Sequence, residues 1–206
     1  MEKPAPIDHP VHELIQRRWS PRAFGGEAVE PEQVLSVLEG ARWAASCFND
    51  QPWSFLVGFR GDETWQGIFD CLAAGNQGWA GAAPVLILSM AHEDFVQTGK
   101  PNRHAHYDVG QAVSAMALQA TALGLQVHQM AGFDPEAART RFSIPPRQTP
   151  MTAIALGYAG DPDALPEDLA KVERAPRDRV PLTAFAFSDA RGTPVSFVRT
   201  ADDPEA

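Results

Sequence analysis

The sequence has few cysteines and no long hydrophobic segment. Only two of its 206 residues are cysteine, Cys47 and Cys71, too few for a disulfide framework or for a cysteine-based zinc site. The longest strongly apolar stretch, residues 82–88, is far shorter than the roughly 20 residues that span a bilayer. The first residues contain no hydrophobic region typical of a signal peptide. We therefore expect a cytoplasmic protein that does not contact the membrane.

Positive charge is also scarce. Lysine and arginine total 17 against 26 aspartates and glutamates, which gives a formal net charge of −9. A chain of this charge has no broad attraction to nucleic acid or to anionic lipid. The arginines form two local clusters, which are Arg17, Arg18 and Arg22 near the N-terminus and Arg174, Arg177 and Arg179 near the C-terminus.

The remaining composition is that of a globular domain. Hydrophobic residues make up 44% of the chain, which is enough to build a core without a disulfide or a structural metal. We find no internal repeat and no shift in composition that marks a domain boundary. The sequence therefore predicts a single domain over residues 1–206.

Hydrophobic periodicity predicts five helices. The first helix is expected after Asp8, as a possible N-cap, and should end near Arg18. The second should run from Pro31 toward Ser46. Three more are expected after Asp62, from His106 to Leu123 and after Asp134. The apolar face predicted for the second helix consists of Val34, Leu35, Leu38, Ala41 and Ala45.

Alternating or continuous apolar runs predict the strands. These runs are residues 55–59, 84–90, 125–131 and 151–158, with a last possible strand at 195–198. The glycine-rich run 73–84 is expected to form a turn or lid, and 160–179 an exposed excursion. The acidic tail 201–206 is expected to be loose. The alternation of helix and strand by itself favours a parallel, doubly wound sheet, although no GxGxxG motif follows any strand.

Two segments carry side chains suited to ligand binding. RRWSPRAF, residues 17–24, places three guanidinium groups and the Ser20 hydroxyl close together and could clamp a phosphate or a carboxylate. A solvated basic end of a helix is an equally good interpretation. ASCFNDQPW, residues 45–53, presents amides, a thiol and a hydroxyl, and the alternative there is an ordinary turn.

The order of these motifs resembles the FMN-dependent nitroreductase superfamily. RRWSPRAF is followed by SCFNDQPW, ALQATALGL, MAGFDPEA and RDRVPL, over about residues 12–182. The resemblance implies an α+β fold, a nitroreductase-like α/β sandwich in which helices cover a mixed, mainly antiparallel sheet. It also implies an extended C-terminal arm at about residues 183–200, and a homodimer whose two active sites are shared between subunits.

The resemblance further implies an FMN-dependent oxidoreductase. In such an enzyme NADH or NADPH binds transiently, donates a hydride and leaves before a nitroaromatic, a quinone or a similar acceptor binds, which is a ping-pong cycle. The flavin carries the redox chemistry, so no dedicated catalytic acid or base is expected. Alternatives are a dehalogenase or a flavin-fragmenting enzyme of the same fold, and a non-enzymatic module that binds a phosphorylated ligand.

The residues that match the family's cofactor site come from five parts of the chain. Arg18 and Ser20 match positions near the FMN phosphate and ribityl chain, and Arg22 matches the basic residue near flavin N1 and O2. Arg177 and Arg179 match a late phosphate-binding pair. The complete set that the resemblance implies is Arg18, Trp19, Ser20, Arg22, Ser46, Cys47, Asn49, Gln51, Asn76, Gln129, Met130, Ala131, Gly132, Arg177 and Arg179.

Two positions depart from the family pattern. Trp19 stands where a basic residue is frequent, and Ala131 where glutamate or glycine is common, which leaves the contact to flavin N5 to backbone. His104, His106 and Asp108 have a spacing that a metal ion could use, but exposed histidines or a loop at the substrate entrance are the commoner interpretation. We expect no metal site.

Overall fold

The computed structural model describes residues 1–198 and divides the chain into two compact units. The first unit is Met1–Ala175, and the second begins at Pro176. The end of the predicted arm at residues 199–200 and the acidic tail at 201–206 lie outside the described residues.

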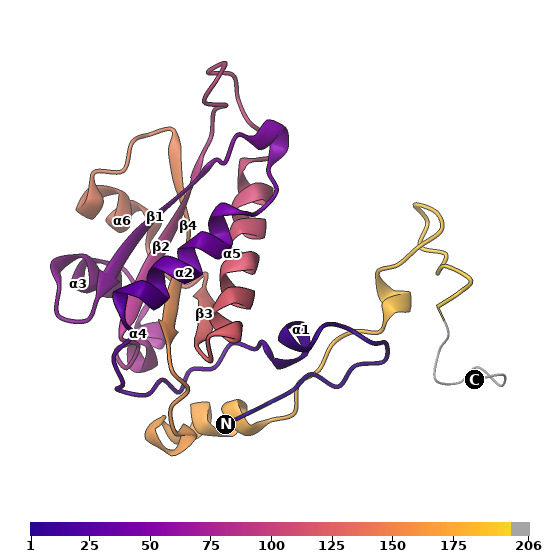
Figure 1. Cartoon of the computed structure of the whole chain (residues 1–206), viewed down its shortest axis with the longest axis horizontal. Helices are drawn as coiled ribbons and strands as arrows, with labels where there is room; N and C mark the ends of the chain where they lie inside the picture. The colour runs from indigo at the N-terminus through magenta and orange to yellow at the C-terminus, as the bar shows by residue number, and fades with distance from the viewer. Residues whose placement is uncertain (199–206) are drawn as a thin grey trace. The chain divides into compact units, whose positions relative to one another are not determined.

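The first unit is built on a four-stranded antiparallel sheet (Figure 1). Its strands are β1 (Trp53–Phe59), β2 (Val85–His92), β3 (Gln126–Met130) and β4 (Gln148–Gly157), in the order β1-β2-β4-β3. All three pairings are antiparallel. The expected α+β fold with a mainly antiparallel sheet is confirmed. The parallel sheet that helix–strand alternation favoured is wrong, because alternation along the chain does not determine strand direction.

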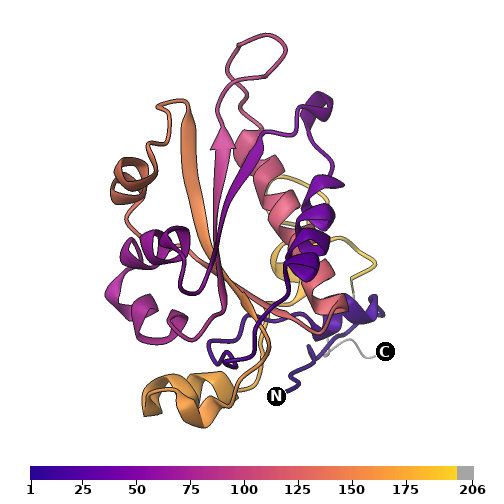
Figure 2. The same cartoon turned by 60° about the vertical axis from the view of Figure 1, so that its left-hand side comes forward.

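Helices cover both faces of this sheet (Figures 1 and 2). α2 (Pro31–Arg42) and α5 (Ala105–Ala122) pack on one face, where they meet Val85 and Ile87 of β2. α3 (Glu63–Asp70), α4 (Ala74–Ala80) and α6 (Pro135–Phe142) lie on the other face, where Leu86 and Leu88 are buried. β2 is therefore apolar on both faces, which explains its continuous hydrophobic run.

The first two helices differ from their predicted bounds. α1 spans Glu13–Arg17. Its N-cap is His12, whose Nδ1 accepts a hydrogen bond from the backbone N–H of Leu14. The N-cap predicted at Asp8 is therefore wrong. α2 ends at Arg42 and buries Val37, whereas Leu35 of the predicted apolar face is 64% exposed.

The glycine-rich segment predicted as a turn or lid is helix α4. Neither of its glycines adopts the left-handed conformation that ends helices, and Trp79 near its end is buried against the core. Burial of a large side chain such as Trp79 stabilises by roughly 1.5 to 3 kcal/mol, which offsets the ~2 kcal/mol that two helical glycines cost, and the buried Ala80 adds to this gain. Tertiary packing therefore outweighs local propensity here.

The segment predicted as an exposed excursion also contains ordered structure. A 3-10 turn, η2 (Pro162–Ala164), precedes helix α7 (Glu167–Arg174), and α7 buries Ala170 and Glu173. No sustained periodicity marks this segment, because α7 is only eight residues long, about two helical turns.

The second unit, over its described residues 176–198, contains one short 3-10 turn, η3 (Leu182–Ala184). An isolated bridge pairs Phe187 with Pro194. The strand predicted at residues 195–198 is wrong, because Val195 to Val198 closes as a turn through a 3.1 Å backbone hydrogen bond.

Candidate functional site

The N-terminal arginine segment, which we define as residues 18–23, leaves α1 in an extended conformation. Arg18 is the C-cap of α1, and its Nη1 donates to the Ser20 hydroxyl at 3.2 Å. Arg18, Ser20 and Arg22 are partly exposed. Trp19 between them is 8% exposed, and the Lys3 ammonium lies 4.9 Å from its ring centroid. The indole is thus part of the core, and its cation neighbour is Lys3.

Two distant side chains hold the backbone of the arginine segment. His128 of β3 forms a 2.9 Å hydrogen bond through Nδ1 with the carbonyl oxygen of Pro21. Glu173 of α7 accepts hydrogen bonds at its Oε1 from the backbone N–H groups of Arg22, at 2.8 Å, and Ala23, at 3.0 Å. Three consecutive residues of the segment are therefore fixed by contacts from β3 and α7.

His128 links the arginine segment to α4. Its ring lies 4.5 Å from the ring centroid of Trp79, and Trp79 in turn stacks on Phe24 at 6.2 Å. Burial is the largest influence on His128 and lowers the pKa of its imidazole below the usual value of 6.5, even though the Pro21 carbonyl opposes this. The imidazole is therefore held neutral near neutral pH.

The end of β3 is joined to α4 by a polar contact. Asn76 Nδ2 donates to the carbonyl oxygen of Gly132 at 2.8 Å, and the Ala73 N–H donates to the same oxygen at 2.9 Å. A Cβ at Gly132 would lie 2.7 Å from Asn76 Nδ2. Gly132 therefore permits an approach that a larger residue would block.

The same strand end exposes backbone to solvent. Gln129, Ala131 and Gly132 are exposed, whereas Met130 is buried. Thr152 donates from its hydroxyl to the Met130 carbonyl at 2.9 Å. The segment Gln129–Gly132 is thus anchored from the sheet and from α4 while its outer side stays accessible.

A cavity of about 240 Å³ opens where the arginine segment meets α4. Arg22, Phe24 and Trp79 are among the residues that line it. The cavity connects the arginine segment with the glycine-rich helix, so Arg22 lies at the border of an accessible space.

The loop that contains the 3-10 turn η1 (Cys47–Asn49) has an unusual backbone. Phe48, Asn49 and Gln51 have φ of 54°, 57° and 54°, in the left-handed region that non-glycine residues seldom adopt. Cys47 N–H donates to Asp108 Oδ2 at 3.0 Å, and Gln51 N–H donates to Ser46 Oγ at 3.0 Å. These contacts hold the strained loop on the start of α5.

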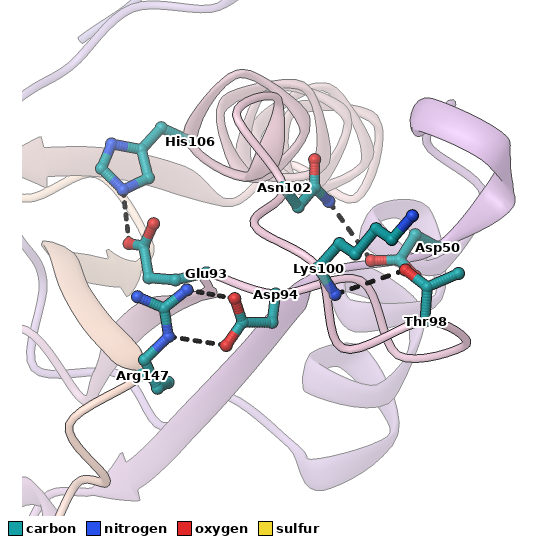
Figure 3. A network of polar contacts seen from close by, with 8 residues as sticks. All are labelled: Asp50, Glu93, Asp94, Thr98, Lys100, Asn102, His106 and Arg147. Atoms are coloured by element: carbon teal, nitrogen blue, oxygen red, sulfur yellow. Dashed lines mark hydrogen bonds and ion pairs between the residues drawn. The ribbon is translucent and has the colours of Figure 1, made fainter.

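A polar network fixes this loop to the segment that follows β2 (Figure 3). Asp50 accepts hydrogen bonds from Val96 N–H, at 2.9 Å, and from Asn102 Nδ2, at 3.2 Å. His106 pairs with Glu93 at 2.7 Å, and Arg147 pairs with Asp94. Burial raises the pKa of Glu93, but hydrogen bonds from His106 and Thr149 together with nearby charge make the net shift downward.

Two side chains of the H-x-H-x-D run make structural contacts of this kind. His106 binds a carboxylate, and Asp108 accepts the Cys47 N–H. Over residues 1–198 no cluster of three or more His, Cys, Asp or Glu side chains is arranged to hold a metal ion.

The structure thus separates the predicted site residues into three groups. Arg18 to Arg22, Asn76 and the strand end at residues 129–132 lie along one continuous strip of the first unit, joined through His128 and Trp79. Ser46, Cys47, Asn49 and Gln51 belong to a separate loop, which the Cys47 N–H joins to Asp108 of α5. Arg177 and Arg179 belong to the second unit, where Arg179 Nη1 donates to the Asp178 carbonyl at 2.7 Å.

The sequence did not indicate the two residues that hold the arginine segment. His128 stands inside an apolar strand and Glu173 inside a segment without periodicity, so neither belongs to a local motif. A polar residue within a predicted buried strand is the one signal that could have indicated His128.

The first unit thus combines an antiparallel α+β sheet with an arginine-bearing strip beside it. Comparison with known families gives the specific relationship. The Nitroreductase family matches residues 15–73 and 58–158, which is more than half of the chain. The chain belongs to the nitroreductase family.

Individual relatives agree with this assignment. An uncharacterised 15.4 kDa protein of Mycolicibacterium smegmatis is 35% identical over 149 residues, which are 68% of this chain and 99% of that protein. A Stutzerimonas stutzeri protein with the provisional name NADH dehydrogenase/NAD(P)H nitroreductase is 29% identical over 200 residues, covering 87% of this chain and 99% of the relative.

Solved structures show the same fold. A crystal structure described as an oxidoreductase containing FMN superimposes with a TM-score of 0.84 at 35% identity, over 89% of this chain and 94% of that chain. A nitroreductase family protein of Clostridium difficile 630 gives a TM-score of 0.63 at 28% identity, over 82% of this chain and 92% of that one. Among residues 1–198 no helix is long and apolar enough to cross a membrane.

Proposed function

We propose that this protein is an FMN-dependent oxidoreductase that passes a hydride from NADH or NADPH to a nitroaromatic, a quinone or a similar acceptor. The observation that carries the proposal is the strip in which Arg18 to Arg22, Asn76 and the exposed strand end at residues 129–132 lie together. The family membership and the relative that contains FMN support it. We place its activity in the cytoplasm.

The donor set of the strip fits FMN. Arg18 and the Ser20 hydroxyl lie 3.2 Å apart and together offer a charged and a neutral donor to a phosphate. Ala131 and Gly132 are exposed, so the strand end beside Asn76 is accessible. These groups suit the two ends of FMN, which carries a phosphate dianion at one end and a flat heterocycle at the other.

The residues have separate tasks in this proposal. Arg18 and Ser20 hold the phosphate, with Trp19 packed beneath them. Arg22 keeps a positive charge at the N1 and O2 edge of the ring, where negative charge develops on reduction. Asn76, together with the strand end Gln129, Met130, Ala131 and Gly132, orients the ring. FMN, when bound, supplies the hydride transfer itself.

Two further sets of residues complete the proposed site. We assign Arg177 and Arg179 to phosphate binding from their sequence match alone. We assign Ser46, Cys47, Asn49 and Gln51 to the flavin of a partner subunit, because they match the loop that the family usually supplies from the opposite subunit. The proposed working unit is therefore a homodimer with two shared sites.

The test is a flavin spectrum followed by anaerobic reduction. The purified protein is scanned for flavin absorbance, depleted of ligand, titrated with FMN and then mixed separately with NADH and NADPH. We expect bound FMN and bleaching of its absorbance by at least one donor. A protein that takes up no FMN would instead favour a binding module for another phosphorylated ligand, and bound FMN that neither donor reduces would overturn the proposed reaction.

A further inference from the structure

Glu173 is a buried carboxylate that the proposed function does not use. It occupies the last turn of α7, where it is 2% exposed, whereas Glu167 and Asp168 in the first turn of the same helix are exposed. Burial of a carboxylate is costly unless hydrogen bonds replace its hydration. A specific arrangement must therefore compensate for this burial.

The compensation comes from the arginine segment. Glu173 Oε1 accepts hydrogen bonds from two consecutive backbone N–H groups, Arg22 at 2.8 Å and Ala23 at 3.0 Å. Two successive amides can point at one oxygen only when the intervening peptide has a defined orientation. The carboxylate therefore fixes the backbone from which the Arg22 side chain departs.

A second contact ties the same turn of α7 to the N-terminus. Lys3 Nζ donates to the Glu173 backbone carbonyl at 2.7 Å and also lies over the ring of Trp19. On the opposite side, His128 binds the Pro21 carbonyl. The backbone of residues 21–23 is thus held by side chains from β3 and α7 rather than by regular secondary structure.

We propose that Glu173 is a positioning residue that sets the placement of the Arg22 guanidinium toward the flavin. The inference rests on the proposed function, because it takes from there the role of Arg22. Charge-assisted hydrogen bonds to backbone are among the strongest polar contacts that a protein forms. The carboxylate is therefore a main determinant of this short segment, beside the His128 contact and the Gly160 N–H that donates to the Ala23 carbonyl at 2.8 Å. Removal of the carboxylate charge should therefore move the Arg22 guanidinium without removing it.

The experiment compares Glu173→Gln and Glu173→Ala with a matched control, Glu167→Gln, in the exposed first turn of the same helix. Each full-length variant is depleted of flavin and titrated with FMN, and the midpoint potential of its bound flavin and its melting temperature are measured. We expect FMN affinity to fall about threefold for Glu173→Gln and about tenfold for Glu173→Ala. The control should match the parent protein.

The midpoint potential separates positioning from a purely structural role. Glu173→Gln should lower the potential in the same direction as Arg22→Ala, and the double variant Arg22→Ala/Glu173→Gln should lie no lower than Arg22→Ala alone. If Glu173→Ala does not fold, Glu173→Gln still decides the matter, because glutamine has nearly the same size but is neutral, and its oxygen accepts weaker hydrogen bonds than a carboxylate oxygen.

The outcomes distinguish this inference from the proposed function. A parent protein that binds no FMN overturns both. A parent that binds FMN, with a Glu173→Gln variant that has the parental potential and FMN affinity, overturns the positioning role alone. A lower melting temperature with an unchanged potential also overturns the positioning role, because it shows that Glu173 only stabilises the fold.

Discussion

His128 Nδ1 donates a hydrogen bond to the carbonyl oxygen of Pro21 over 2.9 Å, and this bond joins β3 to the segment that carries Arg18 and Arg22. Because a carbonyl oxygen can only accept, the proton of the neutral imidazole must reside on Nδ1. The ring tautomer is therefore determined by a backbone contact, and this contact links the arginine segment to one histidine of β3.

Stability should decrease as the solution is acidified through the titration of histidine. Burial lowers the pKa of His128 in the folded state, so below about pH 6.5 the unfolded chain binds a proton that the folded chain does not. The free energy of unfolding is thus expected to fall from pH 7 to pH 5. Urea unfolding at pH 7, 6 and 5 measures this slope.

The matched variants for that slope are His128→Gln and His9→Gln. Glutamine at position 128 retains an N–H donor and does not titrate, so its slope should be flatter than that of the parent. His9 is exposed, and its replacement should leave the slope unchanged. Equal slopes for His128→Gln and the parent would show that another group controls the acid response.

Arg18→Ala should weaken FMN binding more than riboflavin binding. One charge-assisted contact to phosphate is worth about 1.5 to 3 kcal/mol, which corresponds to roughly tenfold or more in affinity. Riboflavin lacks the phosphate and should bind both proteins equally. Arg17→Ala, an exposed neighbour in α1, is the control, and fluorescence titration gives the constants. An equal loss for both ligands would remove Arg18 from the phosphate site.

Gly132→Ala should disturb the junction between β3 and α4. Its new Cβ would stand 2.7 Å from Asn76 Nδ2 and displace that amide from the Gly132 carbonyl. The obstructing atom is the end of a half-exposed side chain that can move aside at the expense of its hydrogen bond, so the cost should be about 1 kcal/mol, and FMN affinity should fall with it. Thermal melts and FMN titration of the variant measure both effects.

Two companion variants test the cause of that effect. Gly78→Ala in α4 has open space around its Cβ and should stabilise the helix slightly. Asn76→Ala/Gly132→Ala removes the obstructing amide and should recover part of the lost stability. A double variant no more stable than Gly132→Ala would place the strain elsewhere.

Two defective variants should restore a binding site when they are mixed. Arg18→Ala impairs the site of its own chain, and Asn49→Ala impairs the site that its loop would complete in a partner. After subunit exchange, each mixed dimer contains one site with Arg18 and Asn49 intact. Random pairing in a two-fold dimer gives roughly a quarter of all sites in this state. FMN bound after mixing, compared with the two separate proteins, measures recovery, and no recovery would mean that the sites are not shared.

Much of the fold could be predicted because the longest elements have clear patterns. α5 shows sustained helical spacing and ends before Gly124, whose φ is +76°. Asp62 and Asp134 cap α3 and α6 as predicted. Strand direction could not be read from β2, because a strand covered by helices on both faces is uniformly apolar in either orientation.

The candidate site was predictable only where short motifs mark it. RRWSPRAF identified the arginine segment, but the contacts that fix it come from residues more than 100 positions away, as the Pro21–His128 and Arg22–Glu173 pairs show. Such contacts depend on tertiary folding and leave no local pattern. The residues that present the ligand donors could therefore be predicted, and the residues that orient them could not.

The left-handed residues Phe48, Asn49 and Gln51 have a consequence for assembly. A loop that became ordered only when two chains meet would lose conformational entropy at that moment, which weakens association. Here Asp50, Asp108 and Ser46 already fix the loop within a single chain. The conformational entropy of the loop is thus lost during folding and not during association. A second subunit would encounter a preformed surface.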